Sequence, residues 1–532
     1  MNPVETLFVD VGASSAGLCR AQFGVDEVLD PHTNLGHAFI ATALARQEHP
    51  ALTTSSKVVS YSELLNCAFD VSRSLLQSSS FSHGSRVLLL LPNSPEYVAA
   101  YFGTLMAGGV VVPLPPKVER EQFHSVRNST GAQHVITQVR TSRTRIDILG
   151  DGPTQNVLPG DRVRLPIAGD DASSLAAIMF TGGSSGTPKG VMLSHRNLLE
   201  NARSIQQYLQ IQPSDRPLCV LPFYHAFGNS VLQSHILAGS HLVLDGNTTF
   251  PETLVDAITK HEVTSLSGVP DLFRFLLERS SLGSTVLPSL KYMAVAGGCL
   301  PHELSIQVAA RISPAKFVVM YGQTEATARL AYVPPDQLHA LKSGCIGRAV
   351  PGVELQVVNS SGIPAAAGES GEIRARGPNI MLGYWRDPKL TGDVIRDGWL
   401  YTGDLGEVDS DGWIYHRGRL NALIKIAGYR IHPSDLENFV VRSLPVQQAV
   451  VVPVEQAERG TRLALFVRVQ AGTTDLNANQ IVAVCRAQLP RHMVPDFVQL
   501  VEEFPLNDAM KIDRPRLVAM ASEASLQRRK IA

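Results

Sequence analysis

The chain has 532 residues, of which 44% are hydrophobic and 18% are charged. It is long enough to form more than one domain with large buried cores, and its composition is typical of a globular protein. Its 47 lysines and arginines nearly balance its 48 aspartates and glutamates, which argues against nucleic acid or an anionic membrane as the main partner.

The cysteines and the apolar stretches indicate the cellular compartment of the protein. The six cysteines are scattered, without zinc-ligand spacing or a disulfide framework, which is typical of a reducing compartment. No basic segment followed by an apolar one opens the chain, so no signal peptide is expected. The most apolar stretch, residues 87–116, contains Pro92, Asn93 and Glu96 too early for a membrane span. The sequence therefore predicts a cytoplasmic protein without a membrane span.

The N-terminal part of the chain predicts alternating helices and strands. Residues 1–35 are weakly patterned and are expected to form a loose lead-in. Residues 61–76 place apolar side chains at helical spacing behind Ser62, the expected N-cap. A strand, a helix and a second strand are expected over residues 86–91, 95–107 and 109–114. This βαβ unit favours a parallel sheet with helices on its faces.

The alternation resumes after residues 138–171, a polar segment rich in Gly and Pro that is expected to be a connection. Further strands are expected over residues 217–221, 241–244, 263–266, 290–296 and 316–320. Further helices are expected over residues 229–237, 251–261, 270–279 and 301–311. Ligands of such sheets bind at the carboxyl ends of the strands, where several motifs of this chain fall.

The predicted fold class is α/β, with a large N-terminal domain over residues 1–420 and a small α+β domain over residues 421–532. The large domain has parallel or mixed sheets with flanking helices. Short strands and Gly-rich turns over about residues 344–417 indicate a β-rich subdomain within it. In the small domain Ser434 is the expected cap of a first helix, and strands and a second helix are expected over residues 446–454, 463–469 and 476–489.

A loop rich in Gly, Ser and Thr follows an apolar run, residues 174–180, that fits a buried strand. Its glycines let backbone N–H groups approach a ligand, its hydroxyls donate and its lysine is positive, a combination suited to a polyphosphate. The candidate ligands are Thr181, Gly182, Gly183, Ser184, Ser185, Gly186, Thr187 and Lys189. Pro188 before the lysine and Gly190 after it exclude a Walker A motif, and Ser194 is expected to cap the next helix.

The stretch Phe180-Thr-Gly-Gly-Ser-Ser-Gly-Thr-Pro-Lys-Gly190 resembles the signature loop of the adenylate-forming superfamily. That superfamily includes acyl- and aryl-CoA synthetases, adenylation domains of nonribosomal peptide synthetases, and firefly luciferase. Gly182 stands where the superfamily usually has serine, and Ser185 where it often has threonine. The resemblance implies that the loop binds ATP. Matching motifs extend in order from about Tyr61 to Arg514.

A second motif, Tyr321-Gly-Gln-Thr-Glu-Ala-Thr327, follows the expected strand 316–320. Tyr321 offers a flat face for a nucleobase, Thr324 can donate to a phosphate oxygen, and Glu325 is a hard oxygen ligand suited to Mg²⁺. The superfamily carries Tyr-Gly-x-Thr-Glu at this place. The resemblance implies that Tyr321 and Gly322 lie beside adenine, that Thr324 and Glu325 act in catalysis, and that Glu325 also holds Mg²⁺.

Two charged residues farther along suit a ribose. Asp404 can accept hydrogen bonds from both hydroxyls, and Arg419 is the cation that would complete the clamp. Either alone would be interpreted as a charge on a surface turn, but together they match the superfamily's ribose-binding pair. By the same resemblance Asn421 is the hinge, where the superfamily usually has Asp or Lys, and Lys425 and Gly428 line the path of the thiol.

Lys511 lies in the last motif, Phe504-Pro-Leu-Asn-Asp-Ala-Met-Lys-Ile-Asp-Arg514. Asn507 and Met510 replace the superfamily's usual threonine and glycine, whereas the lysine, aspartate and arginine remain. The resemblance implies that Lys511 is catalytic and neutralises charge as a carboxylate attacks the α-phosphate of ATP. It also implies that the small domain rotates between two half-reactions and exchanges this loop for the loop that contains Lys425.

The acid pocket is expected around Leu221-Pro-Phe-Tyr-His-Ala-Phe-Gly228, which matches a loop that carries a histidine in acyl- and aryl-CoA synthetases. The resemblance implies that His225, Phe227 and Gly297 line this pocket, and that Gly297 with Gly298 also borders adenine. A packed core histidine is the alternative for His225. Amino-acid adenylation domains place an aspartate here to pair with the ammonium group, and residues 222–237 contain none. The expected substrate is therefore a fatty or aryl acid without an α-amine.

The resemblance implies ATP- and Mg²⁺-dependent activation of a small carboxylic acid to acyl-AMP with release of pyrophosphate, followed by thioester formation with CoA. An alternative interpretation is an acyl-AMP ligase that loads the phosphopantetheine of a carrier protein. A third is a nucleotide-binding protein with little catalysis, because the Lys511 motif is altered.

Overall fold

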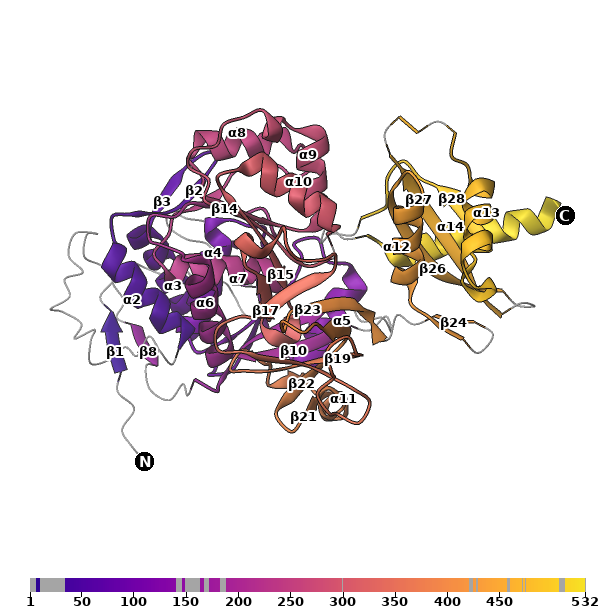
Figure 1. Ribbon diagram of the computed structural model, residues 1–532. Coiled ribbons are helices and arrows are strands. Elements are labelled where there is room, and N and C mark those ends of the chain that lie inside the picture. The colour runs from indigo at the N-terminus through magenta and orange to yellow at the C-terminus, as the bar shows by residue number, and fades with distance from the viewer. Residues whose placement is uncertain are drawn as a thin grey trace. The chain divides into compact units, whose positions relative to one another are not determined.

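The computed structural model describes residues 6–9, 34–139, 146–148, 163–166, 172–181, 188–298, 300–420, 424–426, 429–456, 460–470, 472–473, 475–506 and 512–531. The chain divides into two compact units. The first comprises Met1–Leu355 and Ala375–Leu400, and the second comprises Gln356–Arg374 and Tyr401–Ala532. Figure 1 shows the course of the chain through the elements of both units.

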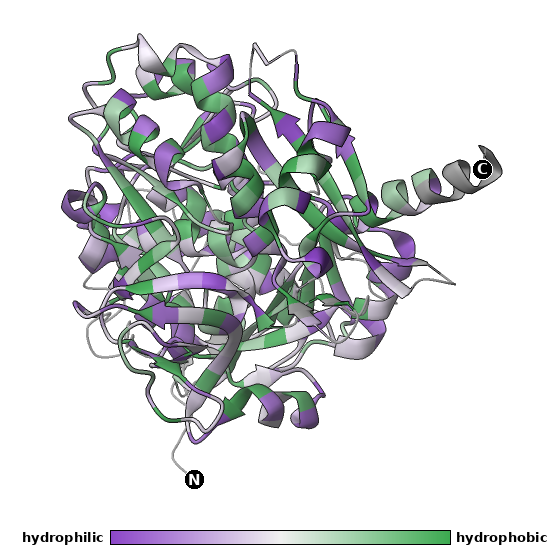
Figure 2. Ribbon diagram, turned by 45° about the vertical axis from the view of Figure 1, so that its right-hand side comes forward, coloured by the Kyte–Doolittle hydropathy of each residue, from purple (hydrophilic) through white to green (hydrophobic). Residues whose placement is uncertain are grey.

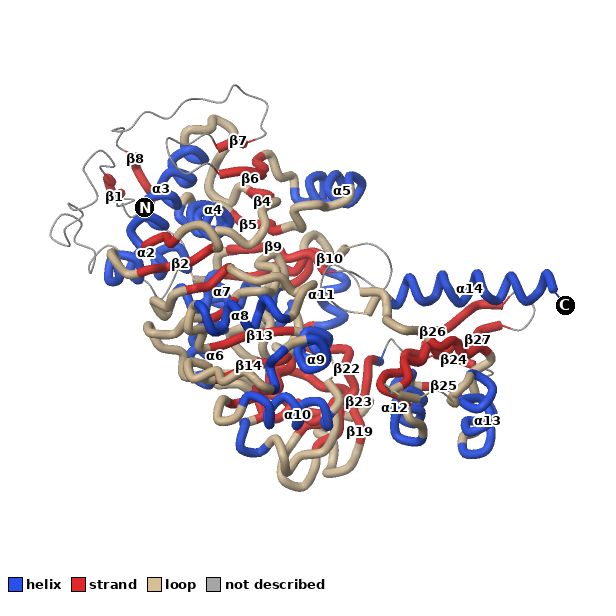
Figure 3. Tube along the Cα trace, turned by 90° about the horizontal axis from the view of Figure 1, so that it is seen from above, coloured by secondary structure: helices blue, strands red, loops and turns tan. Residues whose placement is uncertain are grey.

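The first sheet of the first unit has the strand order β20, β10, β9, β5, β4, β6 and β7. In that order its strands span Gly383–Tyr384, Lys189–Ser194, Leu175–Thr181, Val110–Pro113, Arg86–Leu89, His134–Val139 and Ile146–Ile148. The strands from β9 to β6 are parallel, and Figure 3 shows β6, β4, β5 and β9 side by side. The predicted βαβ unit of β4, α4 (Pro95–Met106) and β5 is confirmed.

Both faces of this sheet are covered, as is usual for parallel strands. Val87 and Leu89 of β4 belong to the core that contains residues of α3 (Tyr61–Leu76) and α4. Leu88, between them, points to the opposite face and packs in the cluster that contains Val126 of α5 (Arg120–Thr130). This alternation follows from the two-residue period of a strand. Figure 2 shows the resulting concentration of apolar residues on the inner strands.

The second sheet of this unit has the strand order β17, β16, β15, β14, β13, β11, β12, β2 and β3. In that order its strands span Cys345–Ala349, Ala331–Val333, Lys316–Tyr321, Tyr292–Val295, Ser265–Gly268, Pro217–Leu218, Leu242–Leu244, Pro50–Thr54 and Val58–Ser60. The strands from β15 to β2 are parallel, and β16, β17 and β3 are antiparallel to their neighbours. The predicted alternation is therefore confirmed, with bounds that shift by a few residues.

Helices connect these strands and cover them. The remaining ones in this unit are α2 (Leu35–Arg46), α6 (His195–Leu209), α7 (Ala226–Leu237), α8 (Glu252–Lys260), α9 (Pro270–Arg279), α10 (His302–Ile312) and α11 (Pro388–Val394). Ser194 caps α6, as predicted, and exchanges hydrogen bonds with Asn197 in a capping box. The predicted cap of α3 was wrong by two residues: Ser60 and Glu63 form the capping box, and Ser62 lies inside the helix.

Three short strands lie where the sequence predicted only a lead-in or a connection. β1 (Thr6–Val9) pairs antiparallel with β8 (Val163–Pro166), and β7 pairs antiparallel with β6. Neither segment has a long enough apolar alternation to reveal such pairing, because each strand has only three or four residues.

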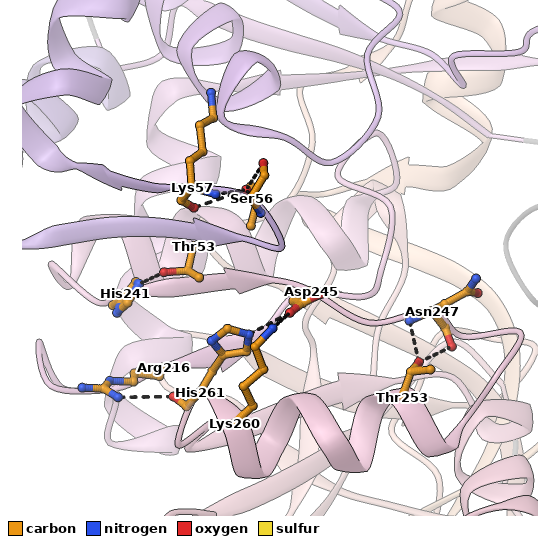
Figure 4. Close-up of polar contacts among 11 residues, drawn as sticks. Thr53, Ser56, Lys57, Arg216, His241, Asp245, Asn247, Thr253, Lys260 and His261 are labelled. Atoms are coloured by element: carbon orange, nitrogen blue, oxygen red, sulfur yellow. Dashed lines mark hydrogen bonds and ion pairs between the residues drawn. The ribbon is translucent and has the colours of Figure 1, made fainter.

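Polar side chains beside β12 form hydrogen bonds with the end of α8 and with β2 (Figure 4). Asp245, which follows β12, accepts hydrogen bonds from Nζ of Lys260 at 2.9 Å and from Nε2 of His261 at 2.8 Å, at the end of α8. His241, which precedes β12, lies with Nε2 2.6 Å from Oγ1 of Thr53 in β2. Burial is the main cause that lowers the pKa of His241 to about 4.

In the second unit β22 (Trp399–Val408) pairs antiparallel with β23 (Ile414–Arg419), and β19 (Ser370–Arg376) and β18 (Glu354–Val358) lie beyond β22 in the same sheet. The hairpin of β24 (Ile424–Ile426) and β25 (Tyr429–Ile431) follows. β26 (Val446–Gln456), β27 (Gly460–Val469) and β28 (Phe497–Leu500) form a further sheet. The helices of the second unit are α12 (Pro433–Ser443), α13 (Ala478–Gln488) and α14 (Arg514–Ile531).

This last sheet separates two small cores. Val451 faces the core that contains Leu436 of α12 and Ile481 of α13, whereas Val450 faces the core that contains Leu517 of α14. The predicted cap of α12 was wrong, because His432 occupies the N-cap position and Ser434 instead donates to the backbone oxygen of Arg417 at 3.1 Å. Among the described helices, none combines the length and the apolar character needed to cross a membrane.

Candidate active site

Three of the predicted motifs of the first unit fall at one edge of its second sheet. The loop with His225 follows β11, Gly297 and Gly298 follow β14, and Gly322 follows β15. β11, β13, β14 and β15 are successive parallel neighbours, so their carboxyl ends lie at the same edge. This is the edge at which open α/β sheets bind ligands.

The turn after β15 has an unusual backbone. A Cβ on Gly322 would lie 1.9 Å from the backbone oxygen of Ala328, so only glycine fits there. Thr324–Ala326 form a single 3-10 turn, and Thr327 and Ala328 then adopt φ values of 54° and 88°. Non-glycine residues rarely occupy this left-handed region, and such strain concentrates at functional sites.

Asn379, which no motif singled out, holds this turn in place. Its side chain is 3% exposed, and its Nδ2 donates to the backbone oxygens of Ala326 at 3.0 Å and Arg329 at 2.9 Å. In return, Oγ1 of Thr327 donates to the backbone oxygen of Asn379 at 2.6 Å. The strained backbone is therefore stabilised by a residue about 50 positions away in the chain.

Glu325 and Lys189 both lie close to the side chain of Tyr384. The hydroxyl of Tyr384 in β20 donates to Oε1 of Glu325 at 2.9 Å. Nζ of Lys189 lies 5.6 Å from the centre of the same ring, because β10 pairs with β20. The arrangement brings together a carboxylate that can bind Mg²⁺ and an ammonium group that can bind phosphate. The donor set therefore fits magnesium triphosphate.

Of the Gly/Ser/Thr loop, the structure describes the two ends. Thr181 at the end of β9 faces Lys189 at the start of β10 across an antiparallel pair, so the loop joins two adjacent strands. The other predicted members lie outside the described residues: Gly182, Gly183, Ser184, Ser185, Gly186 and Thr187.

The loop of the predicted acid pocket is tightly turned. A Cβ on Gly228 would lie 2.1 Å from the backbone oxygen of Pro222, so the chain can fold back only at a glycine. Asn93, between β4 and α4, fixes the loop: its Oδ1 accepts from the backbone N–H of Phe223 at 2.8 Å, and its Nδ2 donates to the backbone oxygen of Leu221 at 2.8 Å.

Two predicted pocket residues begin α7 on this loop. His225 occupies the N-cap position, is half-buried, and lies 4.5 Å from Tyr224 between ring centres. Phe227 is also half-buried, and its ring centre lies 4.0 Å from Cζ of Arg329. Gly297 has φ +85° and, like Gly298, is exposed.

In the second unit Asp404 and Arg419 face each other across β22 and β23. The Asp404 carboxylate is 3% exposed and lies 2.9 Å from Nε of Arg419, whose side chain is 63% exposed. Nε2 of His416 approaches the same carboxylate at 3.5 Å. The predicted pair therefore exists, with the carboxylate sheltered and the guanidinium open to solvent.

The structure describes the backbone of one other predicted site residue of this unit, and the remaining ones lie outside the described part. Lys425 lies in β24 with its backbone opposite Arg430, and its side chain is outside the described part. Asn421, Gly428, Met510 and Lys511 are likewise outside it. A bridge between Leu506 and Ile512 flanks the Lys511 segment.

Sequence reasoning missed Asn93, Arg329, Asn379 and Tyr384. Asn93, Asn379 and Tyr384 act through contacts with segments far away in the chain, which motif spacing does not reveal. Arg329 had one usable signal, since it is a charge within the otherwise apolar run Ala328-Arg-Leu-Ala-Tyr-Val333.

Comparison with known proteins agrees with this architecture. A family model described as AMP-binding enzyme matches residues 39–385, and one described as AMP-binding enzyme C-terminal domain matches residues 435–511. The chain is 28% identical to a long-chain-fatty-acid–CoA ligase of Salmonella typhimurium, over 92% of this chain and 94% of that protein. It is 29% identical to a feruloyl-CoA synthase of Amycolatopsis sp, over 82% of this chain and 89% of that protein.

A solved structure, ATP-bound MatB from Rhodopseudomonas palustris, has the same fold. The TM-score is 0.77 at 24% identity, with coverage of 92% of this chain and 99% of that one. The chain therefore belongs to the AMP-binding enzyme family. It is an AMP-forming acid–thiol ligase, which activates a carboxylic acid with ATP and Mg²⁺ and passes the acyl group to CoA.

Proposed function

We propose that this ligase activates a fatty or aromatic acid that lacks an α-amino group. The observation that carries the proposal is the segment of residues 222–237, the loop and the whole of α7, which contains no Asp or Glu. An α-ammonium group bound beside His225 and Phe227 would have no carboxylate from this segment, and an unpaired buried charge is costly. The relatives named for long-chain fatty acids and for feruloyl-CoA support the same class.

In this proposal the phosphates bind beside Lys189 and Glu325, the two residues that lie close to Tyr384. Lys189 pairs with the phosphate oxygens, Thr324 donates to the α-phosphate, and Glu325 holds the Mg²⁺ that accompanies ATP. The Gly/Ser/Thr loop begins and ends at Thr181 and Lys189, which face each other in adjacent strands. The metal would neutralise phosphate charge, and the side chains would align the reacting groups.

The nucleoside is assigned to two groups of residues. Tyr321, Gly322, Gly297 and Gly298 border adenine, and Asp404 accepts hydrogen bonds from the ribose hydroxyls. The burial of the Asp404 carboxylate supports this role, because a sheltered acceptor competes less with water for a hydroxyl donor. Arg419 then orients the carboxylate through its contact at 2.9 Å.

The reaction proceeds in two balanced steps. A carboxylate oxygen of the acid attacks the α-phosphorus of ATP, the bond to the bridging oxygen breaks, and pyrophosphate leaves. The thiol sulfur of CoA then attacks the acyl carbon, AMP leaves with the oxygen that joined it to the acid, and the thiol proton is released. Lys511 stabilises the charge that develops in the first step, and Lys425 and Gly428 line the thiol path in the second.

The proposed division at Asn421 belongs to the same mechanism. Residues 1–420 would bind ATP and the acid, and residues 421–532 would present the Lys511 loop and then the Lys425 loop. The scattered cysteines support a cytoplasmic location for the enzyme, since they give no disulfide framework.

Acid-dependent release of pyrophosphate tests the proposal. Fatty acids, cinnamic and benzoic acids, and amino acids are offered with Mg·ATP, and the first two groups are expected to be activated. Lys511→Ala should lower release by about 10²-fold or more, whereas Lys117→Ala, a control at an exposed position, should not. Amino acids that outperform the other acids would overturn the acid class.

A second experiment identifies the thiol that accepts the acyl group. Preformed acyl-AMP is mixed with CoA or with a holo carrier protein at equal thiol concentration, and release of AMP is followed. Faster release with CoA is expected. Faster release with the carrier protein would assign the thiol path to a protein-bound phosphopantetheine instead.

A further inference from the structure

Arg329 is a buried cation at the edge of the proposed acid pocket. It follows the two left-handed residues of the turn after β15, and its exposure is 1%. Its guanidinium lies against Phe227, with Cζ 4.0 Å from the ring centre. The side chain therefore reaches the residue that begins the wall of the pocket.

The hydrogen bonding of this guanidinium is incomplete. Among the described residues, no acceptor contacts its buried Nε and Nη1. The hydroxyl of Tyr208 is a hydrogen-bonding neighbour of the side chain, and it also donates to Sδ of Met320 at 3.1 Å. Two buried N–H-bearing atoms of one charged group thus lack an acceptor within the described part of the chain, which is costly unless a ligand supplies one.

No carboxylate of the described residues forms an ion pair with Arg329. Asp215 acts electrostatically on the neighbouring Tyr292 and His235, but its carboxylate is taken by Lys291 and by the backbone N–H of Gln212. Arginine stays protonated inside proteins, so its charge persists. A buried ion without a partner costs several kcal/mol, and contact with an aromatic ring offsets only part of that cost.

We infer that Arg329 determines acid specificity by binding a second carboxylate, at the far end of the acid from the group that is activated. The inference rests on the proposed acid pocket and narrows its substrate class to aliphatic or aromatic dicarboxylic acids. Carboxylates form strong charge-assisted hydrogen bonds with guanidinium N–H groups, so a carboxylate oxygen suits the N–H of Nε or of Nη1. The absence of Asp and Glu from residues 222–237 leaves no competing anion on that segment.

Matched acid pairs test this inference. Each pair has the same length and differs in a terminal methyl or carboxylate: hexanoate and adipate, octanoate and suberate, 4-methylcinnamate and 4-carboxycinnamate. The measured quantity is kcat/KM for acid-dependent pyrophosphate release. The wild-type enzyme should prefer the dicarboxylate in at least one pair by about 10²-fold or more, because a site built for a polar group rejects an analogue that lacks it.

Substitution should reverse the preference. Arg329→Met keeps most of the side-chain volume and removes the charge, so it should lower kcat/KM for the preferred dicarboxylate and raise it for the methyl partner. Arg329→Lys should retain part of the preference. Arg120→Met, a control on the exposed start of α5, should leave it unchanged. The KM for Mg·ATP and the melting temperature show whether the variants are folded.

The outcomes separate this inference from the proposed function. A wild-type preference for the methyl partner in every pair would overturn the role of Arg329 and leave acid activation intact, even if Arg329→Met does not fold. An unchanged preference in folded Arg329→Met would do the same. Failure of the wild-type enzyme to activate any acid of either kind would overturn the proposed function itself.

Discussion

Two regions of the candidate site are built in opposite ways. The turn after β15 is strained, contains consecutive left-handed residues, and is held by Asn379 and Tyr384 from far along the chain. The pairing of Asp404 with Arg419 comes from the antiparallel register of neighbouring strands, beside a register shift between Leu405 and Gly406. Geometry at the first region thus depends on long-range contacts, whereas geometry at the second depends on local pairing.

This difference in construction predicts where a single substitution should reduce activity most. Long-range contacts that hold a strained turn can fail one by one, and each failure would move Thr324 and Glu325. A strand register is fixed by many backbone hydrogen bonds, so one side chain can change without moving its neighbours. Substitutions at the turn should therefore affect activity and stability together, and substitutions at the strand pair should affect nucleotide recognition alone.

The largest effect is expected at Glu325. Glu325→Gln keeps the hydrogen bond from Tyr384 but removes the charge that would hold Mg²⁺, so kcat for pyrophosphate release should fall by about 10²–10³-fold. Steady-state assays at saturating Mg·ATP measure the effect. Glu303→Gln, on the exposed face of α10, is the matched control. Wild-type kcat in Glu325→Gln would exclude a catalytic role for this carboxylate.

Asn379→Ala should come next and should sharpen the comparison most. It removes two hydrogen bonds to buried carbonyls and should cost about 1–3 kcal/mol for each carbonyl left without a partner. Chemical denaturation and kcat should both report the loss. The exposed Asn128→Ala in α5 serves as control. If stability fell and kcat did not change, the turn would not depend on this residue for its active geometry.

A smaller effect is expected at Asp404. Asp404→Asn should leave the strand pairing intact and raise the KM for ATP by about tenfold, as one charge-assisted hydrogen bond is weakened. The penalty for replacing ATP by 2′-deoxy-ATP should shrink in the variant, and Asp393→Asn should show no such change. Equal discrimination between the two nucleotides in variant and wild type would rule out contact with the ribose.

The smallest effect is expected at Asp245, outside both regions. Its pKa is lowered by hydrogen bonds first from His261 and then from Lys260. A lowered folded-state pKa adds stability above the unfolded pKa of about 3.9, and that stability is lost as pH falls through the folded value. Asp245→Asn should therefore speed hydrogen exchange in α8 at pH 7 by less than about tenfold, and less at pH 4. A pH-independent difference would contradict this assignment.

The same comparison explains how far the sequence could be interpreted. The spacing of apolar residues was sufficient to predict the order of strands and helices from β11 to β15, because each of these elements buries an apolar face of its own. The spacing of Asp404 and Arg419 was visible because both lie in motifs on successive strands. Asn379 and Tyr384 could not be predicted, since nothing near them in the sequence indicates the turn that they contact. The caps at Ser62 and Ser434 were wrong because another residue a few positions earlier in the chain occupies each N-cap.

The transfer of oxygen from acid to AMP tests the central claim most directly. The acid is labelled with ¹⁸O in its carboxylate and converted with Mg·ATP and CoA, and the AMP is analysed by mass spectrometry. Attack of the carboxylate on the α-phosphorus predicts one labelled oxygen in each AMP formed. Unlabelled AMP alongside a thioester product would contradict the account, because no acyl-AMP could then have formed.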